Sequence, residues 1–275
     1  MKNCHISILS NELIFLKYKL KFLYDNFDQL IFVDYDILNN CNSKDGTIEF
    51  IESFDDKDNK ITLIKFTEKD LEIINNYNGV SMIEKRKMFS KGSTFINDDI
   101  DIVWATDMDE FFNKNLIKIA EEKFSSDDKL VTLNIPHYIF TYNSFNIFKG
   151  NEKNNSCFIC PPRITRHSKG KIYGHCNFES YGKTLNCDEE FIYHYAYVGY
   201  KRSKSKLRIY TKDNNPEKIR INKKFLNIYS ESLKRNDKYI DIFHPNLKLN
   251  MTSIKFNMPH PDYIKIDEMI SELNN

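Results

Sequence analysis

Asp107 and Asp109 are two carboxylates separated by a single residue, and they directly follow the apolar segment Val103-Trp104-Ala105. Hard divalent cations such as Mg²⁺ prefer oxygen ligands, and Mg²⁺ commonly bridges one or two carboxylates to the phosphates of a substrate. At the end of a buried strand the backbone turns, so both side chains of an Asp-x-Asp pair can face one crevice. A solvated acidic turn is the alternative interpretation. The flanking Trp104 and Glu110-Phe111-Phe112 favour the metal site.

A second acidic pair, Asp34 and Asp36, follows the apolar segment that ends at Val33. A carboxylate at the end of a strand can accept hydrogen bonds from a nucleobase or a ribose. The sequence from Ser43 through Asp45 to Thr47 comes next and is predicted to open a helix, with Asp45 as its N-cap. Because Asp-Gly and Ser-x-Asp are common in turns, an ordinary turn and helix cap are the alternative.

The elements that must position these carboxylates alternate along the first half of the chain. Apolar runs predict strands at 5–9, 30–33, 61–66, 100–105 and 130–136, and helical spacing predicts helices over 12–24, 46–54, 80–90 and 116–124. This alternation is typical of an α/β fold with a doubly wound, mostly parallel sheet and helices on both faces. Ligands of such sheets bind outside the carboxyl ends of the strands. Three polar groups are predicted to meet there: Asn11 with Glu12, Asp34 with Asp36, and Asp107 with Asp109.

The second half of the chain has a different composition. Residues 137–200 are rich in Tyr, Phe, His, Asn and Gly, and residues 201–224 carry many Lys and Arg. We expect a catalytic domain over 1–200, with a nucleotide-binding half (1–136) and an acceptor-side half (137–200). Residues 201–275 are expected to form a basic, helical C-terminal extension that packs on this domain.

Composition excludes several classes of protein. The chain of 275 residues has 40 Lys and Arg against 39 Asp and Glu, so its formal net charge of +1 gives no global field for nucleic acid. The apolar content of 41% is too high for a disordered chain. No apolar run is long enough to cross a membrane, and charged residues interrupt the N-terminal run, so neither a transmembrane helix nor a signal peptide is expected. The six cysteines are too sparse for a disulfide framework, which favours a cytoplasmic protein, with peripheral membrane association left open.

Taken together, the motifs resemble those of family 2 glycosyltransferases with a GT-A fold. The resemblance spans about residues 5–112 and depends, in order, on Asn11-Glu12, Val33-Asp34, Ser43-x-Asp45-Gly46-Thr47 and Asp107-x-Asp109-Glu110-Phe111. It implies a nucleotide-sugar-dependent enzyme that needs Mn²⁺ or Mg²⁺, with a UDP-sugar favoured as donor. Residues 37–42 look inserted relative to the family pattern, which leaves open whether Asp34, Asp36 or Asp45 meets the nucleotide.

The resemblance also implies roles for basic residues and for one histidine. Arg86, between Lys85 and Lys87, is expected to add positive charge at the diphosphate, although such a run is also typical of a solvated helix face. His194 lies in a Tyr-rich strand before Lys201 and Arg202, as in related enzymes where a histidine completes the metal shell; a core histidine is the alternative. We expect metal ligands at Asp107, Asp109 and His194. The residues expected to bind the nucleotide-sugar are Ser10, Asn11, Glu12, Asp34, Asp36, Asp45, Arg86, Asp107, Lys201 and Arg202.

An inverting transfer needs a base for the acceptor hydroxyl and a cation that neutralises the leaving diphosphate. The segment that ends at Glu179 is similar to one that lines the acceptor site in some family members. Glu179 is therefore our candidate base, with Asp188 and Glu110 as rivals and a surface carboxylate as the alternative for Glu179. The acceptor is expected to be a glycan, a protein or a lipid-linked molecule.

Other functions remain open at this point. The same sheet is compatible with a retaining transferase, a sugar-nucleotide hydrolase or a non-catalytic domain that binds a nucleotide or a glycan. Four cysteines could form a zinc knuckle, although only the first pair has ligand spacing: Cys157, Cys160, Cys176 and Cys187. The basic stretch 201–224 could contact nucleic acid, but diphosphate binding or a solvated helix explains it more simply. The oligomeric state is left open.

Overall fold

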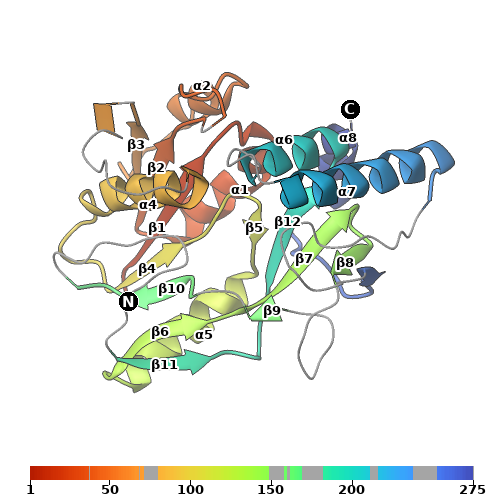
Figure 1. The fold of residues 1–275 in the computed structure, drawn as a ribbon. Helices are drawn as coiled ribbons and strands as arrows, with labels where there is room; N and C mark the ends of the chain where they lie inside the picture. The colour runs from red at the N-terminus through yellow and green to blue at the C-terminus, as the bar shows by residue number, and fades with distance from the viewer. Residues whose placement is uncertain are drawn as a thin grey trace. The chain divides into compact units, whose positions relative to one another are not determined.

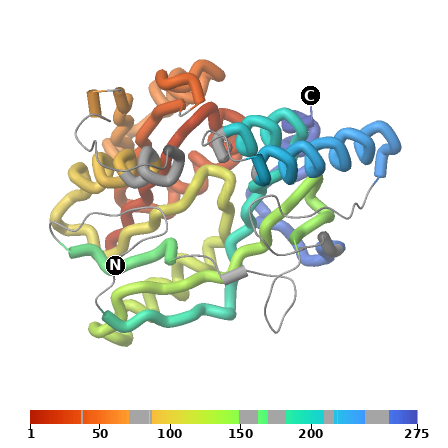
Figure 2. The backbone as a smooth tube through the Cα atoms, in the orientation of Figure 1, coloured from red at the N-terminus to blue at the C-terminus, as the bar shows by residue number. Residues whose placement is uncertain are grey.

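A computed structural model describes residues 1–36, 38–67, 69–70, 80–148, 158–159, 162–168, 182–210, 216–237 and 253–274. The chain divides into two compact units whose segments alternate along the sequence. Figure 2 traces the backbone, coloured by residue number from the N-terminus to the C-terminus. Unit 1 comprises Met1–Met108, Phe112–Ile135 and Cys160–Phe191, and unit 2 comprises Asp109–Phe111, Pro136–Ile159 and Ile192–Asn275. The domain boundaries expected from the sequence, after residues 136 and 200, stay a prediction.

Unit 1 is built on a seven-stranded sheet with the order β11-β6-β10-β4-β1-β2-β3 (Figure 1). The pairs β1–β2, β2–β3, β1–β4 and β6–β11 are parallel, whereas β10 runs antiparallel to both of its neighbours. This topology confirms the expected doubly wound, mostly parallel α/β sheet. The strands are β1 (Asn3–Leu9), β2 (Gln29–Asp34), β3 (Ile61–Lys65), β4 (Ile102–Ala105), β6 (Leu130–Asn134), β10 (Ile164–Arg166) and β11 (Lys183–Asn186).

Helices lie on both faces of this sheet. Successive side chains of β1 point to opposite faces, so β1 contributes packing residues to both. On one side, Ile6 and Ile8 pack with Met88 and Phe89 of α4. On the other side, the ring of His5 contacts Phe27, which follows α1, at 5.4 Å between centroids. The helices of unit 1 are α1 (Leu13–Asn26), α2 (Thr47–Glu52), α4 (Val80–Ser93) and α5 (Lys114–Ser126).

Unit 2 contains a mixed sheet with the order β13-β8-β7-β12-β5, and β9 pairs with β7. Its centre is the parallel pair of β7 and β12, and β5 adds to β12 in the antiparallel direction. The strands are β5 (Glu110–Phe111), β7 (Pro136–Tyr142), β8 (Asn146–Phe148), β9 (Phe158–Ile159), β12 (Ile192–Val198) and β13 (Ser253–Lys255). The helices are α6 (Tyr200–Tyr210), α7 (Pro216–Arg235) and α8 (Ile266–Asn274).

Gly199 connects β12 to α6 in the left-handed region, with φ +80°. A Cβ atom at this position would lie 2.5 Å from the backbone oxygen of Leu273 in α8. Only glycine satisfies both conditions, because it has no side chain and adopts positive φ without strain. Gly199 therefore fixes where α6 begins, and α6 carries Arg202 and Lys206.

A half-buried histidine connects the C-terminal segment of unit 2 to its sheet. His260 Nδ1 lies 2.6 Å from the hydroxyl of Tyr195, and Nε2 lies 3.2 Å from the backbone oxygen of Ser144. Because a carbonyl oxygen can only accept, Nε2 carries the proton and Nδ1 accepts from Tyr195. Burial lowers the pKa of His260 from 6.5 to about 4. The ring is thus neutral in the folded protein at neutral pH.

Unfolding is expected to become easier in mild acid because of His260. Between pH 6.5 and about 4 the unfolded chain binds a proton at this ring and the folded chain does not, so the free energy of unfolding falls as pH falls. At about 1.4 kcal/mol per pH unit, the full loss is about 3 kcal/mol. Urea unfolding of the wild type and of His260→Gln at pH 7.5 and pH 4.5 checks this. The stability of the variant should change less between the two pH values, and equal changes would contradict the assignment.

Candidate functional site

Asp34 ends β2 and is fully buried. Its carboxylate accepts hydrogen bonds from Ser43 N at 2.9 Å and from Ser43 Oγ at 2.5 Å, and its backbone oxygen accepts one from Asn42 Nδ2 at 2.9 Å. Burial raises the pKa of Asp34, against the lowering effect of these Ser43 bonds. Asp34 therefore anchors the loop that precedes α2.

Of residues 37–42, which look inserted in the sequence, the structure describes 38–42. Asp36 N donates to Cys41 O at 2.6 Å, and the Asp36 carboxylate accepts from Leu38 N at 2.9 Å and from Asn11 Nδ2 at 2.8 Å. Asn11, at φ +57°, also accepts from Lys44 N through its side-chain oxygen at 3.0 Å. These bonds bring together the ends of β1 and β2, as the sequence predicted for a parallel sheet.

Asp45 closes the same polar group, which lies at the carboxyl ends of β1 and β2. Helix α2 begins at Thr47, and Asp45 Oδ1 accepts from Thr47 N at 3.1 Å while Oδ2 accepts from Leu13 N at 3.0 Å. The hydroxyl of Thr47 accepts from Glu12 N at 3.0 Å. Asp45 thus holds the starts of α1 and α2 together. We call Asn11, Asp34, Asp36, Ser43 and Asp45 the strand-end cluster.

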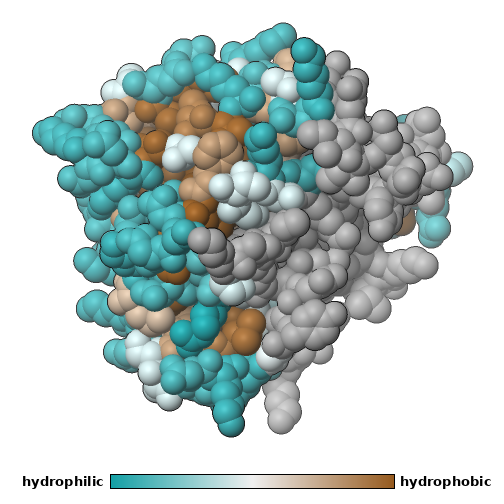
Figure 3. Space-filling model, turned by 90° about the vertical axis from the view of Figure 1, so that its left-hand side faces the viewer, coloured by the Kyte–Doolittle hydropathy of each residue, from teal (hydrophilic) through white to brown (hydrophobic). Residues whose placement is uncertain are grey.

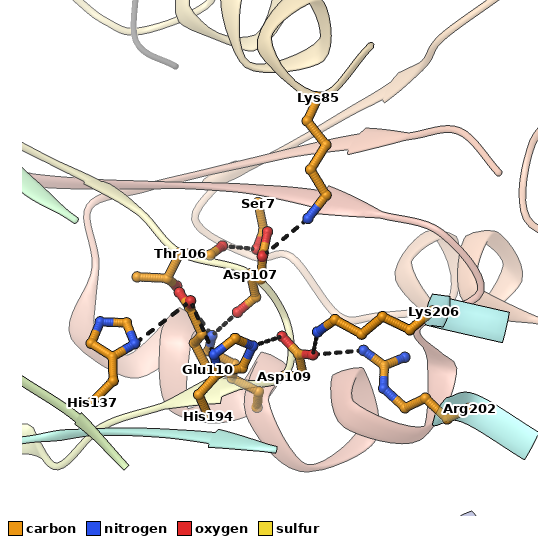
Figure 4. A network of polar contacts seen from close by, with 11 residues as sticks. Ser7, Lys85, Thr106, Asp107, Asp109, Glu110, His137, His194, Arg202 and Lys206 are labelled. Atoms are coloured by element: carbon orange, nitrogen blue, oxygen red, sulfur yellow. Dashed lines mark hydrogen bonds and ion pairs between the residues drawn. The ribbon is translucent and has the colours of Figure 1, made fainter. Parts of the chain in front are cut away.

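The turn after β4 belongs to unit 1 up to Met108. A buried lysine of α1 donates hydrogen bonds to this turn. Lys19 Nζ, from α1, donates to Asp107 O at 2.9 Å and to Thr106 Oγ1 at 3.2 Å. His5 Nε2 lies 2.7 Å from the same Thr106 hydroxyl, and burial, followed by the charge of Lys19, holds the pKa of His5 well below its usual value. The Asp107 carboxylate itself lies 3.2 Å from Lys85 Nζ (Figure 4).

Sequence reasoning missed Lys19. A signal was present, because Lys19 lies at helical spacing with Phe15, Leu16 and Leu23, all of which are buried in α1. A lysine on the buried face of an amphipathic helix requires an acceptor inside the protein. Here the acceptors are the backbone and hydroxyl oxygens of the turn that carries Asp107.

Asp109 belongs to unit 2, where its carboxylate lies among basic side chains (Figure 4). Arg202 Nη2 lies 2.8 Å and Lys206 Nζ 3.0 Å from Asp109 Oδ2, and His194 Nε2 lies 3.4 Å from Oδ1. Burial alone would raise the pKa of this carboxyl, but the charges of Lys206, His194 and Arg202 outweigh burial and hold the pKa well below its usual range. Asp109 is therefore ionised in the folded protein.

Glu110, His137 and His194 form a second group within unit 2. Their side chains point toward one another in Figure 4, and one potential ligand atom from each lies within 4.8 Å of the other two. Strands β5 and β12 bring Glu110 opposite His194, and β7 supplies His137. Sequence reasoning did not select His137, although His137-Tyr138 repeats the pattern of His194-Tyr195 in a neighbouring strand.

The structure describes some of the remaining predicted residues and not others. Asp188 is exposed after β11, Lys201 is exposed on α6, and Ser10 and Glu12 are half-buried at the end of β1. Arg86 lies in α4, but its side chain is outside the description. Glu179 lies outside the described residues, as do three cysteines of the hypothetical zinc knuckle: Cys157, Cys160 and Cys176. The fourth, Cys187, is a buried free thiol.

Comparison with known proteins gives distant structural similarities. Crystal structures that match include S. aureus TarS 1-349 (13% identity, TM-score 0.43, covering 86% of this chain and 74% of that one). A 4-diphosphocytidyl-2C-methyl-D-erythritolsynthase from Anaerococcus prevotii matches at 10% identity and TM-score 0.41, covering 78% of this chain and 96% of its own. A mannose-1-phosphate geranyltransferase from Thermus thermophilus matches at 7% identity and TM-score 0.29, covering 100% of this chain and 68% of its own. These similarities are too low to indicate a shared activity.

No protein-family model and no curated protein matches the chain. Within the part of the chain that the structure describes, no helix is both long and apolar enough to cross a membrane. On the face shown in Figure 3, hydrophilic side chains surround smaller apolar areas. The functional interpretation therefore depends on the chain's own residues.

Proposed function

We propose that this chain is a metal-dependent glycosyltransferase that moves a sugar from a nucleotide-sugar, with a UDP-sugar favoured, to an acceptor hydroxyl. The observation that carries this proposal is Asp109, a buried carboxylate kept ionised by Arg202 and Lys206, two positions after Asp107. Metal-bound diphosphates require both kinds of group: carboxylates for the cation and basic side chains for the phosphate oxygens.

The residues fit Mn²⁺ or Mg²⁺. Asp107 and Asp109 offer carboxylate oxygens, which are the ligands that hard divalent cations prefer. A cation held there would neutralise the charge that develops on the leaving diphosphate. Lys85, Arg202 and Lys206 contribute positive charge at the same two carboxylates, and we assign them to the phosphate oxygens. The ring of His194 faces Glu110 as well as Asp109.

The strand-end cluster supports binding of the nucleoside part. Its groups lie at the carboxyl ends of β1 and β2, where ligands of parallel sheets bind. The carboxylates of Asp34 and Asp36 accept hydrogen bonds from the loop 38–43, so we assign them to positioning this loop. The loop backbone and Asn11 would then make the direct contacts. Glu179 remains our proposed base for an inverting displacement, with Asp188 as its rival.

Asp34→Asn tests the nucleotide-binding role. An amide in place of the carboxylate weakens two charge-assisted hydrogen bonds to Ser43, so nucleotide affinity should fall by on the order of 10-fold. Thermal-shift titrations with UDP, GDP, CDP and their sugars, with and without Mn²⁺, measure this, because a ligand that binds only the folded state raises the melting temperature. Asp128→Asn, at an exposed position of unit 1, is the matched control and should bind as the wild type does.

The outcome also separates the competing functions. A Mn²⁺-dependent rise in melting temperature with one nucleotide, reduced in Asp34→Asn, supports the transferase site and identifies which nucleobase the protein binds. If UDP-sugars are cleaved only to the free sugar with every acceptor tested, the hydrolase replaces the transferase. If no nucleotide shifts the wild type at millimolar concentration, the proposed function is wrong.

A further inference from the structure

We propose that Glu110, His137 and His194 bind a Zn²⁺-class transition-metal ion, at a centre distinct from the Asp107 and Asp109 cation site. The proposal does not depend on the transferase function. It rests on three side chains of unit 2 that lie on three adjacent strands of one sheet.

The geometry brings three donor atoms around one point. His137 Nδ1 lies 3.9 Å from Glu110 Oε1, and His194 Nδ1 lies 3.8 Å from the same oxygen. The two imidazole rings are 6.1 Å apart between centroids and nearly perpendicular, at 77°. Ligands about 2 Å from a tetrahedral ion are themselves a little over 3 Å apart, so a small contraction of the three side chains would supply three of the four ligands and leave the fourth position to water.

The three side chains are largely removed from water. Glu110 and His137 have fully buried side chains, and His194 is only 14% exposed. A buried carboxylate is stabilised by positive charge close to its oxygens. Among the described residues, no hydrogen bond of ordinary geometry reaches either ring nitrogen of His194. A divalent ion among these three side chains would place a positive charge beside Glu110 and would bind Nδ1 of His194, whose Nε2 faces Asp109.

The donor set selects the class of ion. Two imidazoles and one carboxylate suit Zn²⁺ and related transition metals, whereas Mg²⁺ and Ca²⁺ prefer oxygen ligands alone. A carboxylate that can orient the His194 ring is also present, because His194 Nε2 lies 3.4 Å from Asp109 Oδ1. Metal-ligating histidines usually donate their second N–H to such a carboxylate, which fixes the ring. In this arrangement Nδ1 of His194 faces the ion and Nε2 faces Asp109.

The assignment changes the expectation for His194. The resemblance to family 2 glycosyltransferases implied that this histidine completes the metal shell of the Asp-x-Asp pair. The structure places its Nδ1 toward Glu110 and its Nε2 toward Asp109. The imidazole ring of His194 therefore lies between the carboxylates of these two residues. The ion would thereby hold His194, and through it Asp109, in position.

Metal binding by the whole chain, prepared without a histidine tag and stripped with a chelator, tests the proposal. The probe is Co²⁺ alone, whose visible absorption reports imidazole and carboxylate ligands, followed by competition with Zn²⁺. The wild type should bind one equivalent at this centre, with a rise in melting temperature. His137→Gln and Glu110→Gln should each bind on the order of 100-fold more weakly, since losing a direct ligand costs at least as much as losing an outer partner.

Two controls make the result decisive. His167→Gln removes a half-buried histidine of unit 1 and should bind Co²⁺ like the wild type. Asp107→Asn should also keep the Co²⁺ spectrum, which separates this centre from the Asp-x-Asp pair. If the wild type shows no imidazole-type spectrum, or if folded His137→Gln binds Co²⁺ as tightly as the wild type, the centre does not exist. If His137→Gln does not fold, the spectrum and melting temperature of the wild type alone decide.

Discussion

The Asp109→Asn variant is expected to lose transfer activity by on the order of 10²–10³-fold and to be less stable than the wild type by about 3–5 kcal/mol. Both effects have one cause. The Asp109 carboxylate is the buried partner of Arg202 and Lys206, and an amide leaves these two cations without its charge. The same change removes an oxygen ligand from the proposed cation site. Release of UDP from UDP-sugars and urea unfolding measure the two losses separately.

A double-variant cycle keeps the two losses apart. Asp109→Asn combined with Arg202→Gln removes one of the two half-buried cations, so part of the lost stability should return. Activity should not return, because the cation ligand and a phosphate-binding group are then both absent. If the double variant regains activity together with stability, Asp109 serves only the fold.

The Lys19→Met variant is expected to show the second large effect. Methionine keeps the length and apolar stem of the side chain but donates nothing to Asp107 O or Thr106 Oγ1. Leaving these buried acceptors without their donor costs about 1–3 kcal/mol. The turn that carries Asp107 then loses its support, and a small misplacement of a catalytic group lowers kcat by on the order of 10²-fold.

Lys17→Met is the matched control, because Lys17 lies on the exposed face of the same helix. Its stability and kcat should stay close to those of the wild type. A positioning role for Lys19 also predicts weaker binding of Mn²⁺ by Lys19→Met at a temperature where the variant is folded. Unchanged Mn²⁺ affinity with a lower melting temperature would reduce Lys19 to a structural residue.

The sheet of unit 1 could be predicted because its strands and helices have clear local patterns. The runs that end at Val33 and Ala105 are continuous and apolar, as in strands buried on both faces, and the run that ends at Leu9 is mostly apolar. These strand predictions also put Asp34 at the end of one strand and Asp107 and Asp109 after another, as in the structure. The roles of individual acids could not be predicted, because Asp34 and Asp36 turn toward the loop 38–43, and such a choice depends on loop hydrogen bonds that no local pattern reveals.

Lys19 and His137 show where sequence reasoning stops. A lysine in a helix is usually solvated, and only the turn after β4, far along the chain, makes a buried one favourable. His137 becomes notable only once β5, β7 and β12 share a sheet. Pairing between distant strands is a property of the whole fold. The candidate metal centre was therefore invisible in the sequence, whereas the Asp107 and Asp109 pair was not.

Titration calorimetry of UDP with the wild-type chain, in Mn²⁺ and then in excess chelator, tests the central claim most directly. The account predicts binding at one site that requires Mn²⁺ and that disappears in folded Asp107→Asn, since this carboxylate is assigned to the cation. Equal UDP affinity with and without the metal, or equal affinity in Asp107→Asn, would contradict a metal-dependent nucleotide-sugar site at Asp107 and Asp109.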